Sequence, residues 1–184
     1  MNRHQDVLNL YSVNPRSTVS KLLIKESVPK YVKEETLDNI RLGKDYILLP
    51  SDRDGFMQLY LYSGTGTLKR KIGDGKFDIT NVYGVDEKTG DVYYQAAALN
   101  AHDRQIYVSH TNGKVERLTN QEGWNTAIFS GDYQYFVNTW SDYNTPYVYT
   151  TRKNDGKIIA TNVDNHELKA KTQQYGWTKR EAFS

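Results

Sequence analysis

The side chains best suited to acid–base or metal chemistry are four histidines, and their spacing matches no ligand or catalytic pattern. They are His4, His102, His110 and His166. The chain has no H-E-x-x-H pair and no cysteine, so we predict no zinc site, no thiolate nucleophile and no cofactor. Each histidine is interpreted as a solvated loop or strand residue. The G-x-S-x-G turn of α/β-hydrolases is also missing, so this chain by itself is predicted not to be an enzyme.

Three short acidic or glycine-bearing stretches could hold a ligand, and each has a plainer interpretation. "DRDG" at 52–55 hints at an acidic calcium loop but lacks the third acidic position and the closing glutamate, so we predict a turn between two strands. "GDGK" at 73–76 lacks the spacing of a phosphate-binding loop and is interpreted as a turn between repeats. Glu34 and Glu35 are expected on a strand, where neighbours point to opposite faces, so we interpret them as a solvated charge pair.

The charge balance argues against some classes of partner. The chain carries 24 basic and 22 acidic side chains, for a formal net charge of +2. That balance predicts neither nucleic-acid binding nor attraction to an anionic membrane surface. No run of about 18 apolar residues occurs, so no membrane span is predicted, and the N-terminus shows no signal-peptide pattern. The lack of cysteine excludes disulfides without choosing a compartment.

A repeated phrase organises the rest of the sequence. "DRDGFMQLYLYSGTGTLKRKI" returns as "HDRQIYVSHTNGKVERLT", and Tyr60 and Tyr107 at matching positions set a period of about 47 residues. Each copy has an apolar and aromatic run, a glycine turn and an alternating basic run, which predicts a β-hairpin. Asn112-Gly113 predicts a type I′ or closely related turn, with positive φ at both residues. The lysines at 68–72 are interpreted as protection of a sheet edge rather than as a ligand-binding patch.

Weaker copies of the hairpin extend the pattern over the whole chain, and two further strand-like runs precede each later hairpin. Four strands in a period of this length are typical of β-propeller blades. The sequence therefore predicts an all-β fold, a partial β-propeller of about three and a half four-stranded antiparallel blades with one short C-terminal helix. We expect residues 1–184 to be a fragment of a single propeller domain, with a half-blade at about 6–25, blades at about 38–73, 79–119 and 125–162, and a helix at about 165–175.

The expected helix has recognisable signals at both ends. Asp164 stands three residues before Glu167, as in a capping box with Asp in place of Ser or Thr. Gly176 is in place to end the helix. These signals predict a short helix in a chain whose other periodic segments are strands.

Several of these segments resemble, in order, the β-propeller domain of dipeptidyl peptidase IV and related prolyl oligopeptidase-type serine peptidases, especially those of Bacteroidetes. The resemblance rests on "MNRHQDVLNLYSV", "SDRDGFMQLYLYS", "GKFDITNVYGVDEKTGDVYYQA", "AIFSGDYQYFV" and "DNHELKAK". It implies that this chain is the last part of an N-terminal propeller, and that the α/β-hydrolase domain with its catalytic triad lies outside the printed sequence.

The same resemblance bears on the candidate site. The family's paired glutamates, which grip the free amino terminus of the substrate, would lie in an earlier blade, and the residues around Glu34-Glu35 do not match them. The family also has an arginine near the pocket, in the stretch that corresponds to "VPKYVKEE", where this chain has Lys30 and Lys33. Tyr31 and Lys33 are therefore the candidate substrate contacts that the resemblance implies.

Two classes of function stay open at this point. In the first, the chain is a non-catalytic segment of a periplasmic or extracellular serine exopeptidase that removes X-Pro and X-Ala dipeptides from N-termini. The segment would gate and position peptides for the hydrolase domain, and its partners would be that domain, the earlier blades and the peptides. In the second, the chain is a stand-alone propeller-like module that binds proteins or peptides without cleaving them. In either class we expect the isolated chain to self-associate, because terminal blades without neighbours expose apolar faces.

Overall fold

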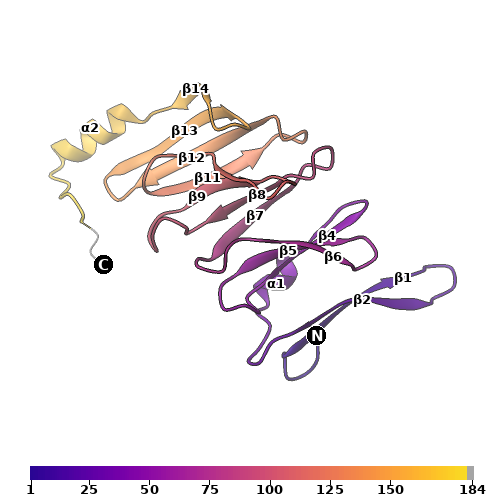
Figure 1. The fold of residues 1–184 in the computed structure, drawn as a ribbon. Coiled ribbons are helices and arrows are strands. Elements are labelled where there is room, and N and C mark those ends of the chain that lie inside the picture. The colour runs from indigo at the N-terminus through magenta and orange to yellow at the C-terminus, as the bar shows by residue number, and fades with distance from the viewer. Residues whose placement is uncertain (182–184) are drawn as a thin grey trace. The chain divides into compact units, whose positions relative to one another are not determined.

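The computed structural model describes residues 1–181, and most of their regular secondary structure consists of antiparallel strands. The chain divides into two compact units, Met1–Ile79 and Thr80–Ser184. The strands form one two-stranded sheet and three four-stranded sheets, and in each larger sheet the strands follow chain order (Figure 1). Four-stranded antiparallel meanders of this kind are the units of a β-propeller, so the predicted all-β fold class is confirmed.

The first unit contains a hairpin and one four-stranded sheet. Its elements are β1 (Val7–Val13), β2 (Ser20–Ser27), α1 (Glu35–Asp38), β3 (Arg41–Leu42), β4 (Tyr46–Ser51), β5 (Gln58–Ser63) and β6 (Leu68–Ile72). The two middle strands, β4 and β5, are buried along almost their whole length, as expected for unbroken apolar runs. The hydrophobic core joins the hairpin to this sheet through Leu8, Ile24, Val28, Val32, Ile47, Leu49, Tyr60 and Tyr62.

The second unit contains two four-stranded sheets and the C-terminal helix. Its elements are β7 (Ile79–Val85), β8 (Val92–Ala96), β9 (Gln105–Ser109), β10 (Val115–Arg117), β11 (Trp124–Phe129), β12 (Tyr135–Asp142), β13 (Thr145–Lys153), β14 (Ile158–Val163) and α2 (His166–Gln174). Aromatic rings pack together in its core. The centroid of the Phe129 ring lies 4.7 Å from that of Tyr93 and 4.9 Å from that of Phe136. Such contacts stabilise a core beyond the area that they bury.

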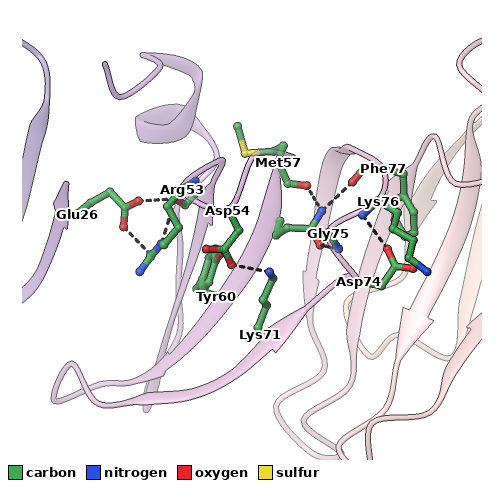
Figure 2. Close-up of polar contacts among 12 residues, drawn as sticks. Glu26, Arg53, Asp54, Met57, Tyr60, Lys71, Asp74, Gly75, Lys76 and Phe77 are labelled. Carbon is green, nitrogen blue, oxygen red and sulfur yellow. Dashed lines mark hydrogen bonds and ion pairs between the residues drawn. The ribbon is translucent and has the colours of Figure 1, made fainter. Parts of the chain in front are cut away.

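A buried glutamine opens the third strand of two of the sheets. Gln58 begins β5 and donates to the carbonyl oxygen of Phe77 over 2.7 Å, while the Gly75 amide donates to its side-chain oxygen over 3.1 Å (Figure 2). Gln105 begins β9 and donates to the carbonyl oxygen of Gln121 over 2.8 Å. Both side chains are fully buried and tie the third strand to the chain that leaves the fourth. In the first unit, the bond from the Gly75 amide to Gln58 holds "GDGK" in a bend that follows β6, in agreement with the predicted turn.

The prediction of a type I′ turn at Asn112-Gly113 is wrong. The Gly113 amide donates to the His110 carbonyl over 2.9 Å, and φ is positive at Gly113 (86°) but not at Asn112. The loop therefore has three residues, a type I turn followed by one glycine in the left-handed region, which is the next most common way to close a hairpin. The hairpins that contain Gly66 and Gly156 close in the same way, with φ of 90° and 85°.

The start of the C-terminal helix also differs from the expectation. Asn165, not Asp164, is the N-cap of α2, with φ of 52° and no side-chain cap bond, so the capping box with Glu167 does not form. Instead, Asp164 accepts a hydrogen bond from the backbone amide of His166 over 3.2 Å. The end of the helix is as predicted, because Gly176 has φ of 72° and its amide donates to the Gln173 carbonyl.

The segment around Glu34 and Glu35 is not a strand, contrary to the expectation. Glu35 is the first residue of α1, and the Leu37 amide donates to the Glu34 carbonyl over 2.8 Å. Val32 and Thr36 are buried while Glu34 between them is exposed. This spacing of four residues suits a helical turn rather than the alternation of a strand. No helix in the described part of the chain is long and apolar enough to cross a membrane.

Candidate functional site

The connection between β4 and β5 carries the densest group of charged side chains in the first unit. It is the turn predicted from "DRDG", closed by a hydrogen bond from the Gly55 amide to the Asp52 carbonyl over 2.8 Å. Gly55 has φ of 104°, a conformation that favours glycine. Within residues 1–181, no group of three or more His, Cys, Asp and Glu side chains could hold a metal ion. The three charged side chains of the turn, Asp52, Arg53 and Asp54, each form an ion pair with another side chain.

Arg53 is held on several sides by neighbouring groups. Its guanidinium lies 2.5 Å from Glu26 Oε2 and donates to the Tyr62 hydroxyl over 3.0 Å. It also donates to Ser51 Oγ over 3.2 Å, and its Cζ lies 3.9 Å above the centroid of the Tyr60 ring. Figure 2 shows Arg53 between Glu26 and Tyr60. An arginine with an ion pair, hydrogen bonds and a ring contact has one preferred position, so it fixes the turn from which it extends.

Glu26 is the buried partner of this arrangement. It lies on β2, its side chain is 2% exposed, and one carboxylate oxygen accepts a hydrogen bond from the Ser51 hydroxyl. Burial raises the pKa of Glu26 above its ordinary value, against the opposing effects of the Ser51 hydrogen bond and the Arg53 charge. A carboxylate in such a place is stable only because both of its oxygens face a donor or a positive charge.

Asp54 forms a second group of polar contacts on the outer side of the turn. It accepts hydrogen bonds from the Tyr60 hydroxyl over 2.7 Å and from Lys71 Nζ over 2.5 Å (Figure 2). These two donors lower the pKa of Asp54, while burial and the hydrogen bond to Asp54 raise the pKa of Tyr60. Lys71 belongs to the basic strand β6, so at least this lysine has a specific partner in addition to protecting a sheet edge.

The two candidate substrate contacts lie beside the same turn. The Lys33 ammonium is 3.3 Å from Asp52 Oδ2, with 43% of the Lys33 side chain exposed. Tyr31 is 55% exposed and Val32 between them is buried, so the segment presents Tyr31 and Lys33 outward on either side of an anchored residue. Glu34 is exposed as well. The structure thus brings Lys33 to the charged turn, a contact that the sequence did not predict.

The residues that the sequence analysis missed are Glu26 and Arg53. A signal for Glu26 was present, because Ile24 and Glu26 are two apart on a strand and so share a face, and both are buried. Arg53 carried no such signal, since an arginine in a polar turn is usually solvated.

The four histidines are spread along the chain, with His4 and His102 in loops and His110 in the hairpin after β9. His166 is the first residue of α2, so the prediction of a loop or strand residue is wrong there. His110 Nδ1 lies 2.9 Å from Asp91 Oδ2, and His166 Nδ1 lies 2.7 Å from Asp164 Oδ1. His4 and His102 are exposed. Hydrogen bonding to Asp164 raises the pKa of His166. These are ion-pair and surface arrangements rather than a catalytic or metal-binding group.

Two open hollows lie in the second unit. The larger has a volume of about 800 Å³ and is bordered by the loops at 100–103, 122–124 and 141–144. Its bordering segments are held by bonds within and between them, since Asn100 accepts hydrogen bonds from the amides of His102 and Asp103, and the Gly123 amide donates to Asp103 Oδ1 over 2.8 Å. The smaller, of about 580 Å³, lies where β14 leads into α2. The smaller hollow is bordered by Asp164 and His166, whose hydrogen bond lowers the pKa of Asp164 and raises the pKa of His166. Both side chains are exposed, as is usual for an ion pair at a surface.

The meandering four-stranded sheets define a protein of the β-propeller class. Residues 1–147 match the family model of the dipeptidyl peptidase IV (DPP IV) N-terminal region, and the chain belongs to that family. The predicted family resemblance is therefore confirmed.

Relatives with known names agree with this assignment. The chain is 26% identical to dipeptidyl peptidase 4 of Trichophyton rubrum over 192 residues, which cover 99% of this chain and 24% of that protein. It is 26% identical to dipeptidyl peptidase 4 of Arthroderma otae, over 95% of this chain and 24% of the relative. The crystal structure of Porphyromonas gingivalis dipeptidyl peptidase 4 superposes with a TM-score of 0.90 at 32% identity, covering 94% of this chain and 25% of that one. The chain thus spans about a quarter of the length of the relatives that it matches.

Proposed function

We propose that this chain is a non-catalytic propeller segment of a serine-type dipeptidyl peptidase, and that it gates and positions peptides for a hydrolase domain encoded elsewhere in the full-length protein. The full-length enzyme would remove X-Pro and X-Ala dipeptides from N-termini. The observation that carries the proposal is the ordered match to the N-terminal region of this family over most of the chain. The absence of a G-x-S-x-G turn from the printed sequence supports the assignment of a non-catalytic role.

Activity measurements on two proteins test this proposal. The full-length gene product should release chromophore from an Ala-Pro anilide and remove dipeptides from short peptides but not from folded proteins. The chain of residues 1–184 should show no turnover, because it offers no activated nucleophile. A natural gene product that ends at Ser184 and binds peptides without cleaving them would favour the stand-alone binding module instead. Turnover by this chain, with covalent labelling by a serine-directed fluorophosphonate, would contradict the non-catalytic role.

Within this function, we propose that Tyr31 and Lys33 contact the peptide substrate. Both side chains are partly exposed, and Lys33 is oriented by Asp52 at 3.3 Å. A lysine ammonium held in this way can donate to a peptide carbonyl, and the Tyr31 ring can pack on a side chain. In the full-length enzyme, Lys33→Met and Tyr31→Ala should each raise KM for a tripeptide several-fold with little change in kcat. Lys30→Met, at an exposed lysine three positions earlier, is the matched control, and an equal effect there would argue against a specific contact.

We propose that the isolated chain self-associates through its apolar faces. All six residues of the edge strand β14 are exposed, among them Ile158, Ile159 and Val163, and the β1–β2 hairpin exposes Tyr11, Val13 and Leu22. Apolar surface of this kind is usually covered in a soluble protein. Sedimentation equilibrium at micromolar concentration should give a mass above the 21.2 kDa of one chain. A single species of monomer mass would show that these faces do not drive association.

We further propose that residues 1–184 belong to a single propeller domain, and that the full-length protein acts in the periplasm or outside the cell. The ordered likeness to the propeller region of one enzyme family supports both statements. Limited proteolysis of the full-length protein should leave this region in one resistant fragment together with the earlier blades. Cell fractionation should recover the full-length protein outside the cytoplasm, and a cytoplasmic location would refute the second statement.

A further inference from the structure

Glu26 is an unusual residue to find buried at the end of a strand. Only 2% of its side chain is exposed, and its two oxygens face Ser51 Oγ and the Arg53 guanidinium, which both belong to the end of β4 and the turn that follows. A buried ion pair seldom stabilises a fold more than an apolar pair of the same size would. Its presence is therefore better explained by the position that it imposes on the turn than by stability.

Arg53 transmits that position to Asp52. The backbone amide of Arg53 donates to Ser51 Oγ over 3.1 Å, and its guanidinium donates to the same oxygen over 3.2 Å. Asp52 thus lies in the chain between the buried residue Ser51 and Arg53. The backbone amide and the guanidinium of Arg53 are both fixed by hydrogen bonds. The side chain of Asp52 is 24% exposed and its Oδ2 lies 3.3 Å from Lys33 Nζ. Glu26 thus contacts Arg53, the backbone joins Arg53 to Asp52, and Asp52 contacts Lys33.

The backbone that carries Lys33 is anchored on both sides, because the buried residue Thr36 donates its amide hydrogen to the Lys33 carbonyl over 3.1 Å. The Val32 amide donates to the Gln5 carbonyl over 2.6 Å, and Val32 is 3% exposed. The side chain of Lys33 leaves this anchored residue and extends toward Asp52. A long lysine side chain loses considerable freedom when it is held in one place, so an oriented acceptor is needed to keep it there.

We propose that Glu26 and Arg53 are positioning residues that fix the Asp52 carboxylate and, through it, the Lys33 ammonium for contact with a peptide substrate. The proposal rests on the proposed function for its substrate. The positioning itself is a property of the contacts in the first unit and can be tested without substrate.

The first test measures the freedom of Lys33 directly. The full-length protein is treated with an amine-acetylating reagent, and the acetylation rates of Lys33 and Lys30 are followed by mass spectrometry. In the wild type, Lys33 should react several-fold more slowly than Lys30. Glu26→Gln, which keeps the shape of the side chain, and Asp52→Asn should each bring the Lys33 rate close to that of Lys30. An unchanged Lys33 rate in folded Glu26→Gln protein would overturn the positioning role.

The second test asks whether Glu26 acts on the substrate through Lys33. Glu26→Gln should raise KM for a tripeptide several-fold at constant kcat, and it should have no further effect on KM in the Lys33→Met background. Arg53→Lys, which keeps the charge but not the planar group, should lie between wild type and Glu26→Gln. Equal effects of Glu26→Gln in both backgrounds would overturn the proposed path. If Lys33→Met leaves KM unchanged while Glu26→Gln still accelerates acetylation, the substrate contact is wrong and the positioning of Lys33 stands.

Discussion

The strands β5 and β9 hold the same place in their sheets, yet their flanking connections are stabilised in different ways. The turn before β5 sends Arg53 to Glu26 on β2 and Asp52 to Lys33. The loop before β9 has internal bonds, since Asn100 accepts hydrogen bonds from the amides of His102 and Asp103. It is also joined to the segment that leads into β11, because the Gly123 amide donates to Asp103 Oδ1 over 2.8 Å and the Arg104 amide donates to the Gly123 carbonyl over 2.9 Å.

The hairpins that follow these two strands also differ in the space around their glycines. A Cβ at Gly66, after β5, would overlap the carbonyl oxygen of Leu23 on β2, whereas no atom of its own unit lies within 4 Å of a Cβ at Gly113, after β9. The sheet of β5 is therefore joined to β2, a segment earlier in the chain, at both ends of its third strand. The sheet of β9 is joined to the segment before β11, which is later in the chain, and the hairpin after β9 is held to its own sheet by the Thr111 amide, which donates to Asp91 Oδ1 over 3.3 Å. Lys33 lies beside the sheet whose turn reaches back to β2.

The largest effect should come from Gly66→Ala. Positive φ costs an alanine about 1–2 kcal/mol, and the overlap with the Leu23 carbonyl adds about 1–3 kcal/mol unless β2 moves. Gly55→Ala is the matched control in the same unit, because Gly55 has φ of 104° and no atom within 4 Å of its Cβ position. Urea unfolding should show a loss about twice as large for Gly66→Ala as for Gly55→Ala. Equal losses would mean that the hairpin is not pressed against β2.

A smaller loss is expected for Arg53→Met. The substitution leaves the Glu26 carboxylate buried without its positive partner, a cost of about 2 kcal/mol at pH 7. Arg104→Met in the loop before β9 should cost less, because the Arg104 guanidinium donates to the carbonyl oxygens of Ala101 and Asp103 rather than to a buried carboxylate. The Arg53→Met loss should shrink as the pH is lowered, since protonated Glu26 needs no ion pair. A loss that does not depend on pH would show that Arg53 acts through packing alone.

The turn at Gly113 should give a third, smaller effect that distinguishes the two turn types. Gly113→Val should destabilise the chain by about 1 kcal/mol, because valine resists positive φ. Asn112→Gly should bring no stabilisation, since φ at Asn112 is already negative and its side chain accepts a hydrogen bond from the Lys114 amide over 2.9 Å. In a type I′ turn the same change would relieve a positive φ and stabilise the hairpin, so a gain in unfolding free energy would restore the original prediction.

The smallest effect concerns the pH dependence contributed by Glu26. Its pKa is raised by burial, so the folded state binds this proton more tightly than the unfolded state does, whose value is near 4.5. The contribution of Glu26 to stability is therefore fully present below that value and is lost as the pH rises through the folded pKa. Glu26→Gln should show a less negative slope of unfolding free energy against pH in this window. Identical slopes for both proteins would mean that Glu26 has no raised pKa.

Much of the fold followed from the sequence because its determinants are local. Alternating apolar residues and glycine turns mark the hairpins, and the repeat of about 47 residues marks the four-stranded units. Gly176 ends α2 as predicted for the same reason. Failures also occurred where two local choices compete. A hairpin with a glycine turn can close with two or three residues, so the sequence did not decide the backbone conformation of Asn112. Asp164 and Asn165 can each precede a helix, so the sequence did not decide which of them is the N-cap of α2.

The candidate site was decided differently. The sequence, through its family resemblance, pointed to Tyr31 and Lys33, but the contacts that orient them join residues far apart in the chain. Glu26 meets Ser51 and Arg53 only because the core of the first unit packs β2 onto the sheet of β4 and β5. No local pattern encodes such a pairing, since an arginine in a polar turn and a glutamate at a strand end are both ordinary on a surface. The amino-acid sequence by itself determined most of the strands, the positions of the hairpins and the family, because these depend mainly on neighbours along the chain. Only the tertiary structure decided which charges are buried together, because burial depends on what the fold brings alongside.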